Sequence, residues 1–291
     1  MWLIYALTSY LCTATTSVAD KILLNKIVSH PFVYAFTIAM LGCVVVFAIP
    51  FGVTVIPLTY LLWSLLSGGL FVGALLVLFT AYKLYPVSVA ATIVGGAQPI
   101  ATLVLANIFL GESLSISALI AVIVLIISIG FLSYSPKQKI EIKLLELTSL
   151  SGFLFASSFV IGKFIYEHVS FLDGIFWSRI GAGVCALALL GVASYRQAVL
   201  QTKQQSPQAP LLVIVIQAIG ALGFILFNMA IATGSVTVVN ALLGVQFALI
   251  FVLSSLLSSK FVALKENITP KILTIRLIGL GLVALGLYIL A

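Results

Sequence analysis

Ten apolar runs, each long enough to cross a lipid bilayer, make up most of this chain. A helix needs about 20 apolar residues to cross the hydrocarbon core. The runs lie at residues 2–19, 32–50, 58–82, 87–110, 114–134, 144–166, 172–194, 210–232, 236–259 and 271–290. Only 7% of the 291 residues are charged, whereas a soluble domain has about 25%. The sequence therefore predicts an all-α integral membrane protein with ten transmembrane helices.

The two halves of the chain match each other at polar positions. A shift of 148 residues places Gln98 on Gln246 and Thr92 on Asn240, and a shift of 142 places residues 14–18 on residues 156–160. Each half then holds five helices, and because five is odd the second half enters the membrane in the opposite sense. This predicts two inverted five-helix repeats, residues 1–135 and 143–291, joined by a loop at 136–142. Inverted repeats are common in secondary transporters.

Three short segments resemble a known family. They are residues 84–90, the Gln98-Pro99 pair in the fourth run, and residues 109–114, which read FLGESL. With them the chain resembles the drug/metabolite transporter superfamily, specifically the EamA-type carriers built from two repeats of five helices. In that family the fourth helix carries a proline and ends in Gly-Glu, and the position matching Arg179 is often arginine. The resemblance implies a ten-helix carrier of small metabolites and does not identify the solute.

Polar side chains within the apolar runs are the candidates for contact with a solute. Such groups cost free energy in a bilayer unless they face protein or water. The candidates are Gln98, Thr92, Asn228, Asn240, Gln246, Arg179, Thr16 and Ser158. Pairs related by the repeat suit a central site between the two halves. They suit equally well a role in hydrogen bonding between helices, and the sequence leaves both interpretations open.

Charged residues near the helix ends are candidates for gating or for coupling to an ion. They are Asp20, Lys163 and Glu167. Arg179 is expected to open the seventh helix, and its planar guanidinium suits a carboxylate; the alternative is that it extends to the lipid headgroups. Gly95, Gly96 and Pro99 predict a break in the fourth helix, which either exposes backbone to a solute or simply kinks the helix.

No enzymatic or nucleotide-binding motif is present, so we expect neither a cofactor nor a bound metal. The three cysteines lie in apolar runs without metal-ligand spacing. The net charge of +7 is spread over several segments, which argues against a nucleic-acid partner. We expect a monomer or homodimer that moves a small metabolite, such as an amino acid, by secondary active transport and alternating access, with proton coupling left open. The alternative is a non-transporting membrane protein, such as a lipid-modifying enzyme or a scaffold.

The cationic residues favour one orientation in the membrane. Twelve of the 14 lysines and arginines lie in or beside the odd-numbered gaps between the runs, and only Lys163 and Arg179 flank the even-numbered ones. The positive-inside rule then places the odd gaps in the cytoplasm and both termini outside. We therefore expect a multi-pass protein of the plasma membrane, or of the inner membrane in a bacterium. The family resemblance implies the opposite orientation.

Overall fold

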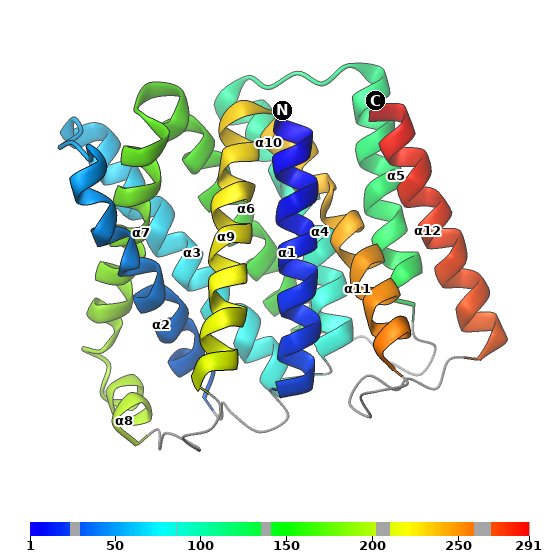
Figure 1. The fold of residues 1–291 in the computed structure, drawn as a ribbon, viewed down its shortest axis with the longest axis horizontal. Helices are drawn as coiled ribbons and strands as arrows, with labels where there is room; N and C mark the ends of the chain where they lie inside the picture. Colours follow the sequence, from blue (N-terminus) through cyan, green and yellow to red (C-terminus); the bar gives the residue numbers. More distant parts are fainter. Residues whose placement is uncertain (24–29, 86, 135–140, 202–209, 259–268, 291) are drawn as a thin grey trace.

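The computed structural model consists of helices packed side by side, with both ends of the chain at the same end of the bundle (Figure 1). It describes residues 1–23, 30–85, 87–134, 141–201, 210–258 and 269–290, and no strand occurs among them. The helices of the first half are α1 (Trp2–Leu23), α2 (Pro31–Gly42), the 3₁₀ helix η2 (Cys43–Phe51), α3 (Leu58–Leu84), α4 (Val87–Leu110) and α5 (Ile116–Leu132). Those of the second half are α6 (Ile142–His168), α7 (Phe171–Leu189), α8 (Ala193–Gln201), α9 (Pro210–Thr233), α10 (Val236–Ala241), α11 (Leu243–Leu257) and α12 (Pro270–Leu290).

Seven helical segments of the described part are long and apolar enough to cross a membrane. They are Pro31–Phe51, Leu58–Leu84, Val89–Leu110, Ile142–His168, Phe171–Leu189, Val236–Leu257 and Pro270–Leu290. α5 and the Ala218–Thr233 part of α9 are shorter apolar helices, and α1 carries more hydroxyl side chains than the others. The prediction of an all-α membrane protein is confirmed, whereas ten crossing helices in two inverted repeats are not established by these lengths.

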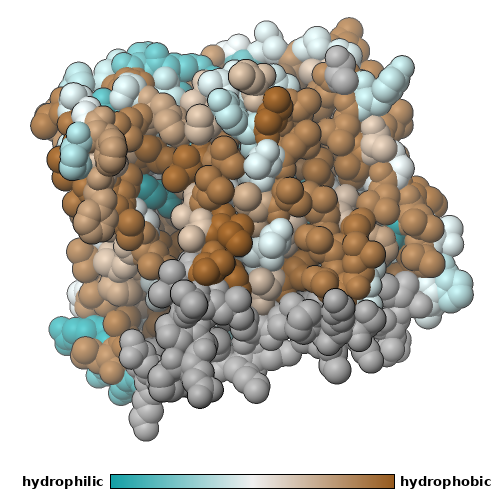
Figure 2. Space-filling model, in the orientation of Figure 1, coloured by the Kyte–Doolittle hydropathy of each residue, from teal (hydrophilic) through white to brown (hydrophobic). Residues whose placement is uncertain are grey.

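The surface matches a lipid environment. Figure 2 shows a mostly hydrophobic face with more hydrophilic residues along its upper rim. Large apolar side chains stand on the outside of the bundle, and Phe47 is 77% exposed. Apolar side chains are stable in such positions only where lipid replaces water around them.

The helices differ from the sequence prediction in several places; one is the second run, which divides into α2 and η2. The seventh run ends early, because α7 stops at Leu189 and the short helix α8 follows as a separate element. The ninth run divides at Leu242 into α10 and α11. In contrast, α4 continues without interruption through Gly95, Gly96 and Pro99, where the sequence predicts a break. Proline removes one hydrogen-bond donor, and a membrane helix tolerates this loss when neighbouring helices surround it.

Short polar residues and glycines explain several of the helix boundaries. Ser115, Ser170 and Ser235 each cap a helix, α5, α7 and α10 respectively, by accepting a hydrogen bond from a backbone N–H of the first turn. Gly111, with φ of +63°, reverses the chain between α4 and α5, a conformation that costs other residues free energy.

Close packing between helices depends on glycine. A Cβ atom placed on Gly68 of α3 would lie 2.2 Å from the carbonyl oxygen of Ser178, and one on Gly181 of α7 would lie 2.6 Å from the Cα of Leu65. A Cβ on Gly152 of α6 would lie 3.0 Å from the backbone nitrogen of Gln98 in α4. Small residues of this kind allow membrane helices to approach at their backbones. They fix α3 against α7 and α6 against α4, which places four helices around the centre of the protein.

Candidate functional site

A narrow pocket lies among α3, α6, α7 and α9. Its lining residues are Ser67, Ser158, Phe159, Gly162, Tyr166, Ile175, Ser178, Arg179, Phe224 and Asn228. The pocket is just wide enough to hold a water molecule. α3 belongs to the first half of the chain and α6, α7 and α9 to the second, so the pocket exists only because the two halves pack together.

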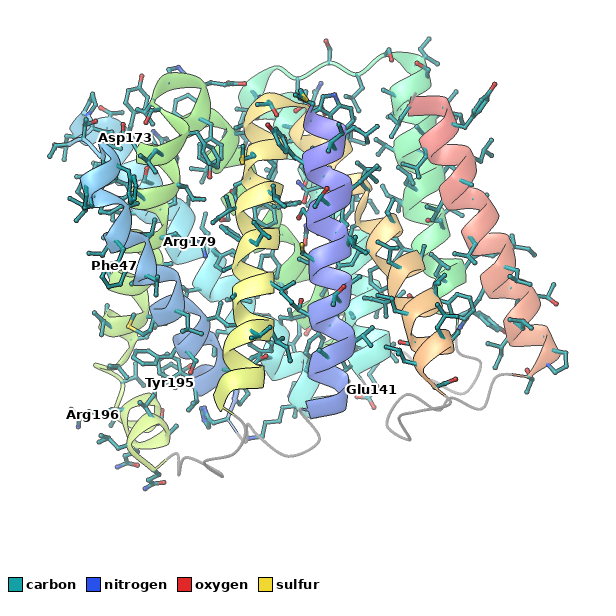
Figure 3. The ribbon with its side chains drawn as sticks, viewed as in Figure 1. Phe47, Glu141, Asp173, Arg179, Tyr195 and Arg196 are labelled. Carbon is teal, nitrogen blue, oxygen red and sulfur yellow. The ribbon has the colours of Figure 1, made fainter. Side chains whose placement is uncertain are left out.

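Arg179 is the one cation among the lining residues. It is the ninth of the 19 residues of α7, since α7 begins at Phe171, and Figure 3 places it midway between the two ends of the bundle. The expectation that Arg179 opens the seventh helix is therefore wrong, because that helix begins eight residues earlier. Its Cα atom is about 12 Å along the helix from that of the first residue, at a rise of about 1.5 Å per residue.

The guanidinium of Arg179 makes ring contacts in place of an ion pair. Its central carbon lies 3.8 Å from the centre of the Phe224 ring and 4.5 Å from that of Phe71. Among the described residues its Nε is buried without a hydrogen-bond partner, and no carboxylate forms a salt bridge with it. Cation–π contacts offset part of the cost of burying a charge, and the hydrogen-bonding capacity of this Nε remains unused.

Hydroxyl and amide groups form the rest of the polar lining. Ser67 and Ser158 donate to each other's backbone carbonyl at 2.9 Å, and the Tyr166 hydroxyl donates to Oδ1 of Asn228 at 2.9 Å. The hydroxyl of Ser178, which is 6% exposed, has no partner among the described residues. Buried polar atoms are almost always paired, so the two unpaired ones on adjacent residues, Nε of Arg179 and Oγ of Ser178, make this pocket the candidate site for a ligand.

Aromatic rings fill the space beside the pocket. Phe71 of α3 contacts Phe155 and Phe159 of α6, with ring centres 5.6 and 6.4 Å apart, and Phe224 of α9 at 5.5 Å. Phe227 continues the cluster from Phe159 at 4.9 Å. The centre of the molecule is thus mainly apolar, and the polar groups gather on one side of it, around Arg179.

Among the described residues, no acidic side chain lines the pocket. Asp173 lies at the start of α7, where Figure 3 shows it nearer the end of the bundle that carries the termini. It accepts hydrogen bonds from the backbone and hydroxyl of Thr54, at 2.7 and 3.0 Å, and from Ser170 at 2.7 Å. Glu112, at the turn after α4, accepts a hydrogen bond from Ser235. Both carboxylates therefore hold loops to helix ends and stand apart from the pocket.

The described candidates for gating, Lys163 and Glu167, do not line the pocket. Lys163 pairs with Glu167 at 3.4 Å on the same helix and donates to the carbonyl of Ala232 at 3.3 Å. This contact joins the end of α6 to the end of α9. The side chain of Asp20 lies outside the described residues.

The polar candidates separate into two groups. Arg179, Asn228 and Ser158 line the pocket. Gln98 of α4 instead donates to the Oδ1 of Asn240 of α10 at 2.6 Å, and Asn240 is fully buried. This pair has the geometry of hydrogen bonding between helices, the second of the two interpretations that the sequence leaves open.

The remaining candidates do not line the pocket. They are Thr16, Thr92 and Gln246. Thr16 donates to the carbonyl of Thr13 in its own helix at 2.9 Å. Gly95 in α4 provides room for the ring of Phe247, which would lie 2.8 Å from a Cβ at that position. Gly95 thus serves close packing between α4 and α11.

Sequence reasoning missed Ser67, Tyr166, Ser178 and the phenylalanine cluster. One signal for Tyr166 was present, because Ser158, Gly162 and Tyr166 follow at intervals of four residues and share one face of α6. The contribution of Ser67 depends on the approach of α3 to α6 and α7, and its own sequence neighbourhood carries no such signal.

Comparisons with known proteins agree with this architecture. Residues 1–134 match the EamA-like transporter family, and no curated protein matches the chain. A solved structure, described only as the crystal structure of a protein, superposes with a TM-score of 0.73 at 16% identity, covering 99% of this chain and 97% of that one. At this identity the likeness concerns the fold alone. The fold is therefore shared along almost the whole chain, and residues 1–134 are similar to the EamA-like transporter family.

Proposed function

We propose that this protein is a secondary carrier that moves a small solute across the membrane by alternating access, with the pocket beside Arg179 as its binding site. The observation that carries this proposal is the pair of unpartnered polar atoms, Nε of Arg179 and Oγ of Ser178, in a pocket at mid-depth. Intramembrane ionisable residues are rare, and they usually belong to the pathway of a substrate or an ion. The match of residues 1–134 to a transporter family supports the same function.

Equivalent contacts in the two halves support an inverted repeat. The hydroxyl of Ser9 in α1 donates to the carbonyl of Gly223 in α9 at 2.7 Å, and that of Ser151 in α6 donates to the carbonyl of Ala74 in α3 at 3.0 Å. Ser9 and Ser151 are related by the shift of 142 residues that matches the starts of the two halves. In addition, α5 packs against α12 and α2 against α7, so each of these helices contacts its own counterpart (Figure 1).

Two buried apolar clusters support a gate at each end of the pocket. At the end away from the termini, Ala81 of α3, Ala90 of α4 and Leu144 of α6 form one cluster. At the other end, the start of α1, the end of α9 and the start of α10 meet around Ala6 and Ile231, which belong to the large apolar core that also runs through the centre of the bundle. An inverted repeat exchanges these two sets of helices. Because the pocket holds only a water-sized molecule, solute entry requires one cluster to separate while the other stays closed.

The described cations support the orientation that the charge count favours. Lys83 lies in the last turn of α3, and Lys143 and Lys271 lie in the first turns of α6 and α12. Figure 3 places Arg196, on α8, at the same end. We propose that this end faces the cytoplasm and that both termini lie outside. Because no described carboxylate lines the pocket, a group that couples transport to protons would have to lie outside it.

Flux measurements on purified protein in liposomes test the proposed function. A panel of labelled small solutes, covering acids, amino acids, amines and neutral compounds, should include at least one that enters faster than into protein-free liposomes. Replacing Gly162, which lines the pocket, with leucine should abolish that flux. Gly281→Leu is the matched control, because nothing lies within 4 Å of a Cβ at this exposed position of α12.

Two results would count against a carrier. One is the absence of any flux from a folded protein across the whole panel, which would favour a non-transporting membrane protein. The other is equal flux in the Gly162→Leu variant and the wild type, which would place the solute path elsewhere.

A further inference from the structure

We infer that the solute is an organic anion with a single negative charge, a monocarboxylate, held by Arg179 and Ser178. This inference rests on the proposed function and adds the charge of the substrate to it. It narrows the expectation from the sequence, which includes amino acids and other small metabolites.

The pocket has a charge of +1 and nothing within it balances that charge. Arginine cannot lose its proton under conditions in which proteins are folded. Among the described acidic residues, Asp173 is engaged with Thr54 and Ser170, and Glu167 pairs with Lys163. A buried charge without a partner is strongly unfavourable, so a negatively charged ligand is the species that this pocket favours most.

A cation or the ammonium group of a zwitterion has no comparable place in the pocket. The faces of Phe71 and Phe224, which would attract an ammonium, already lie against the guanidinium of Arg179. The amide oxygen of Asn228 already accepts the hydrogen bond from Tyr166. An ammonium would also be repelled by Arg179, and the described lining provides no carboxylate to offset that repulsion. Amino acids should therefore bind more weakly than acids of the same size.

The donors and walls of the pocket favour a carboxylate over a phosphate. The planar guanidinium pairs with a carboxylate through two parallel hydrogen bonds, and the unpartnered hydroxyl of Ser178 can donate a further one. A phosphate monoester carries about 1.5 to 2 negative charges at pH 7, which exceeds the single positive charge. Ile175, Phe159 and Phe224 supply apolar contacts for the rest of a short acid.

Charge balance also predicts how the carrier moves. With a monocarboxylate bound, the pocket is neutral when both gates are closed. Without one, closing both gates leaves the guanidinium unpaired and shielded from water. The loaded form should therefore pass between the two orientations more readily than the unloaded form, and a carboxylate on the far side of the membrane should accelerate transport.

Binding measurements with matched probes test this inference. Butyrate, butyramide, 2-aminobutyrate and butylamine share a four-carbon body and differ in charge; benzoate and benzamide extend the set to an aromatic acid. Thermal shifts of the detergent-purified protein are recorded at constant ionic strength, with sodium chloride alone as the inorganic anion. Protein in phosphatidylglycerol nanodiscs, compared with phosphatidylcholine, distinguishes a lipid phosphate from a soluble acid as the source of the anion.

We expect at least one carboxylate to stabilise the wild type, with its amide, the zwitterion and the amine having no effect at the same concentration. Arg179→Gln should weaken carboxylate binding about tenfold or more, while Arg179→Lys should retain part of it. Arg276→Gln is the control, because Arg276 is also an arginine within a spanning helix, α12, and does not line the pocket. In liposomes, the carboxylate on the opposite side should speed its own flux in the wild type only.

Several outcomes would overturn the inference. They are equal stabilisation by the amide or the zwitterion, unchanged carboxylate binding in Arg179→Gln, a response to chloride or phosphatidylglycerol alone, and no response to any carboxylate. Flux of a neutral solute that is independent of Arg179 would refute the inference and leave the carrier intact. Carboxylate binding without any flux would refute the carrier and leave the anion site intact.

Discussion

Replacing Arg179 with methionine removes a charge from the middle of α7 while leaving an unbranched side chain to fill its volume. We expect the variant to be more stable than the wild type and inactive as a carrier. The physical reason is that the guanidinium has no carboxylate partner among the described residues and its Nε is buried without a hydrogen bond. A site that binds an anion has to keep this unfavourable charge, and such sites commonly reduce stability.

The size of the effect follows from two opposing contributions. An arginine at the centre of a membrane helix costs about 2.5–3.5 kcal/mol on the insertion scale. The contacts with Phe71 and Phe224 recover about 1–2 kcal/mol, and the thioether of methionine keeps part of that through its own contacts with the rings. The expected gain is about 1–2 kcal/mol, equivalent to a rise of about 2–8 °C in Tm.

Thermal unfolding in detergent, followed by near-ultraviolet circular dichroism, measures this change without any ligand. Arg276→Met in α12 is the control and should not raise the Tm, because Arg276 lies outside the pocket and already interacts with another group of the protein. Flux through the Arg179→Met variant should fall to background. A Tm lowered by several degrees would show that the guanidinium is compensated within the protein, and the reasoning about an unpaired charge would then be wrong.

Three further predictions concern the packing and the ends of the bundle. Gly181→Ala should lower the free energy of unfolding by about 1–3 kcal/mol, because its Cβ would meet the backbone of α3 at 2.6 Å. Gly96→Ala, whose Cβ would have nothing within 4 Å, should raise it by about 0.5–1 kcal/mol. Equal effects of the two substitutions in thermal unfolding would contradict the close approach of α7 to α3. Gln98→Leu and Asn240→Leu should each cost about 1–3 kcal/mol, and the double variant less than their sum, whereas additive losses would disprove their hydrogen bond. Burial, and to a smaller extent the charge of Lys83, lower the pKa of His30 in the folded protein, so the unfolded chain binds more protons at this residue. The Tm should therefore be constant above about pH 6.5 and fall as the pH drops towards the folded-state pKa. His30→Asn should remove this dependence of the Tm on pH.

The sequence alone identified the class of the protein and the positions of its helices. Each of the ten apolar runs coincides with a helix or a pair of joined helical segments in the described residues. This succeeds because lipid leaves the backbone no partner except itself, so a run of about 20 apolar residues must become a helix. The match of residues 1–134 to a transporter family confirms the resemblance inferred from residues 84–90, Gln98-Pro99 and residues 109–114.

The functional site was only partly accessible from the sequence. Polarity within an apolar run drew attention to Arg179 and Asn228, which line the pocket, and equally to Gln98 and Asn240, which bond to each other. A polar residue in lipid needs a partner, and the sequence does not say whether that partner is another side chain or a solute.

What the sequence determined was that this chain forms membrane helices and where each of them begins and ends, to within a few residues. Which sides of the helices meet was decided by the tertiary structure. These helices are apolar on nearly all sides, so no amphipathic stripe defines an inner face. Instead, backbone contacts at Gly68, Gly152 and Gly181 fix the rotation of α3, α6 and α7. That rotation turns Arg179 and Ser178 towards one pocket, and the pocket exists only where helices distant in sequence pack together.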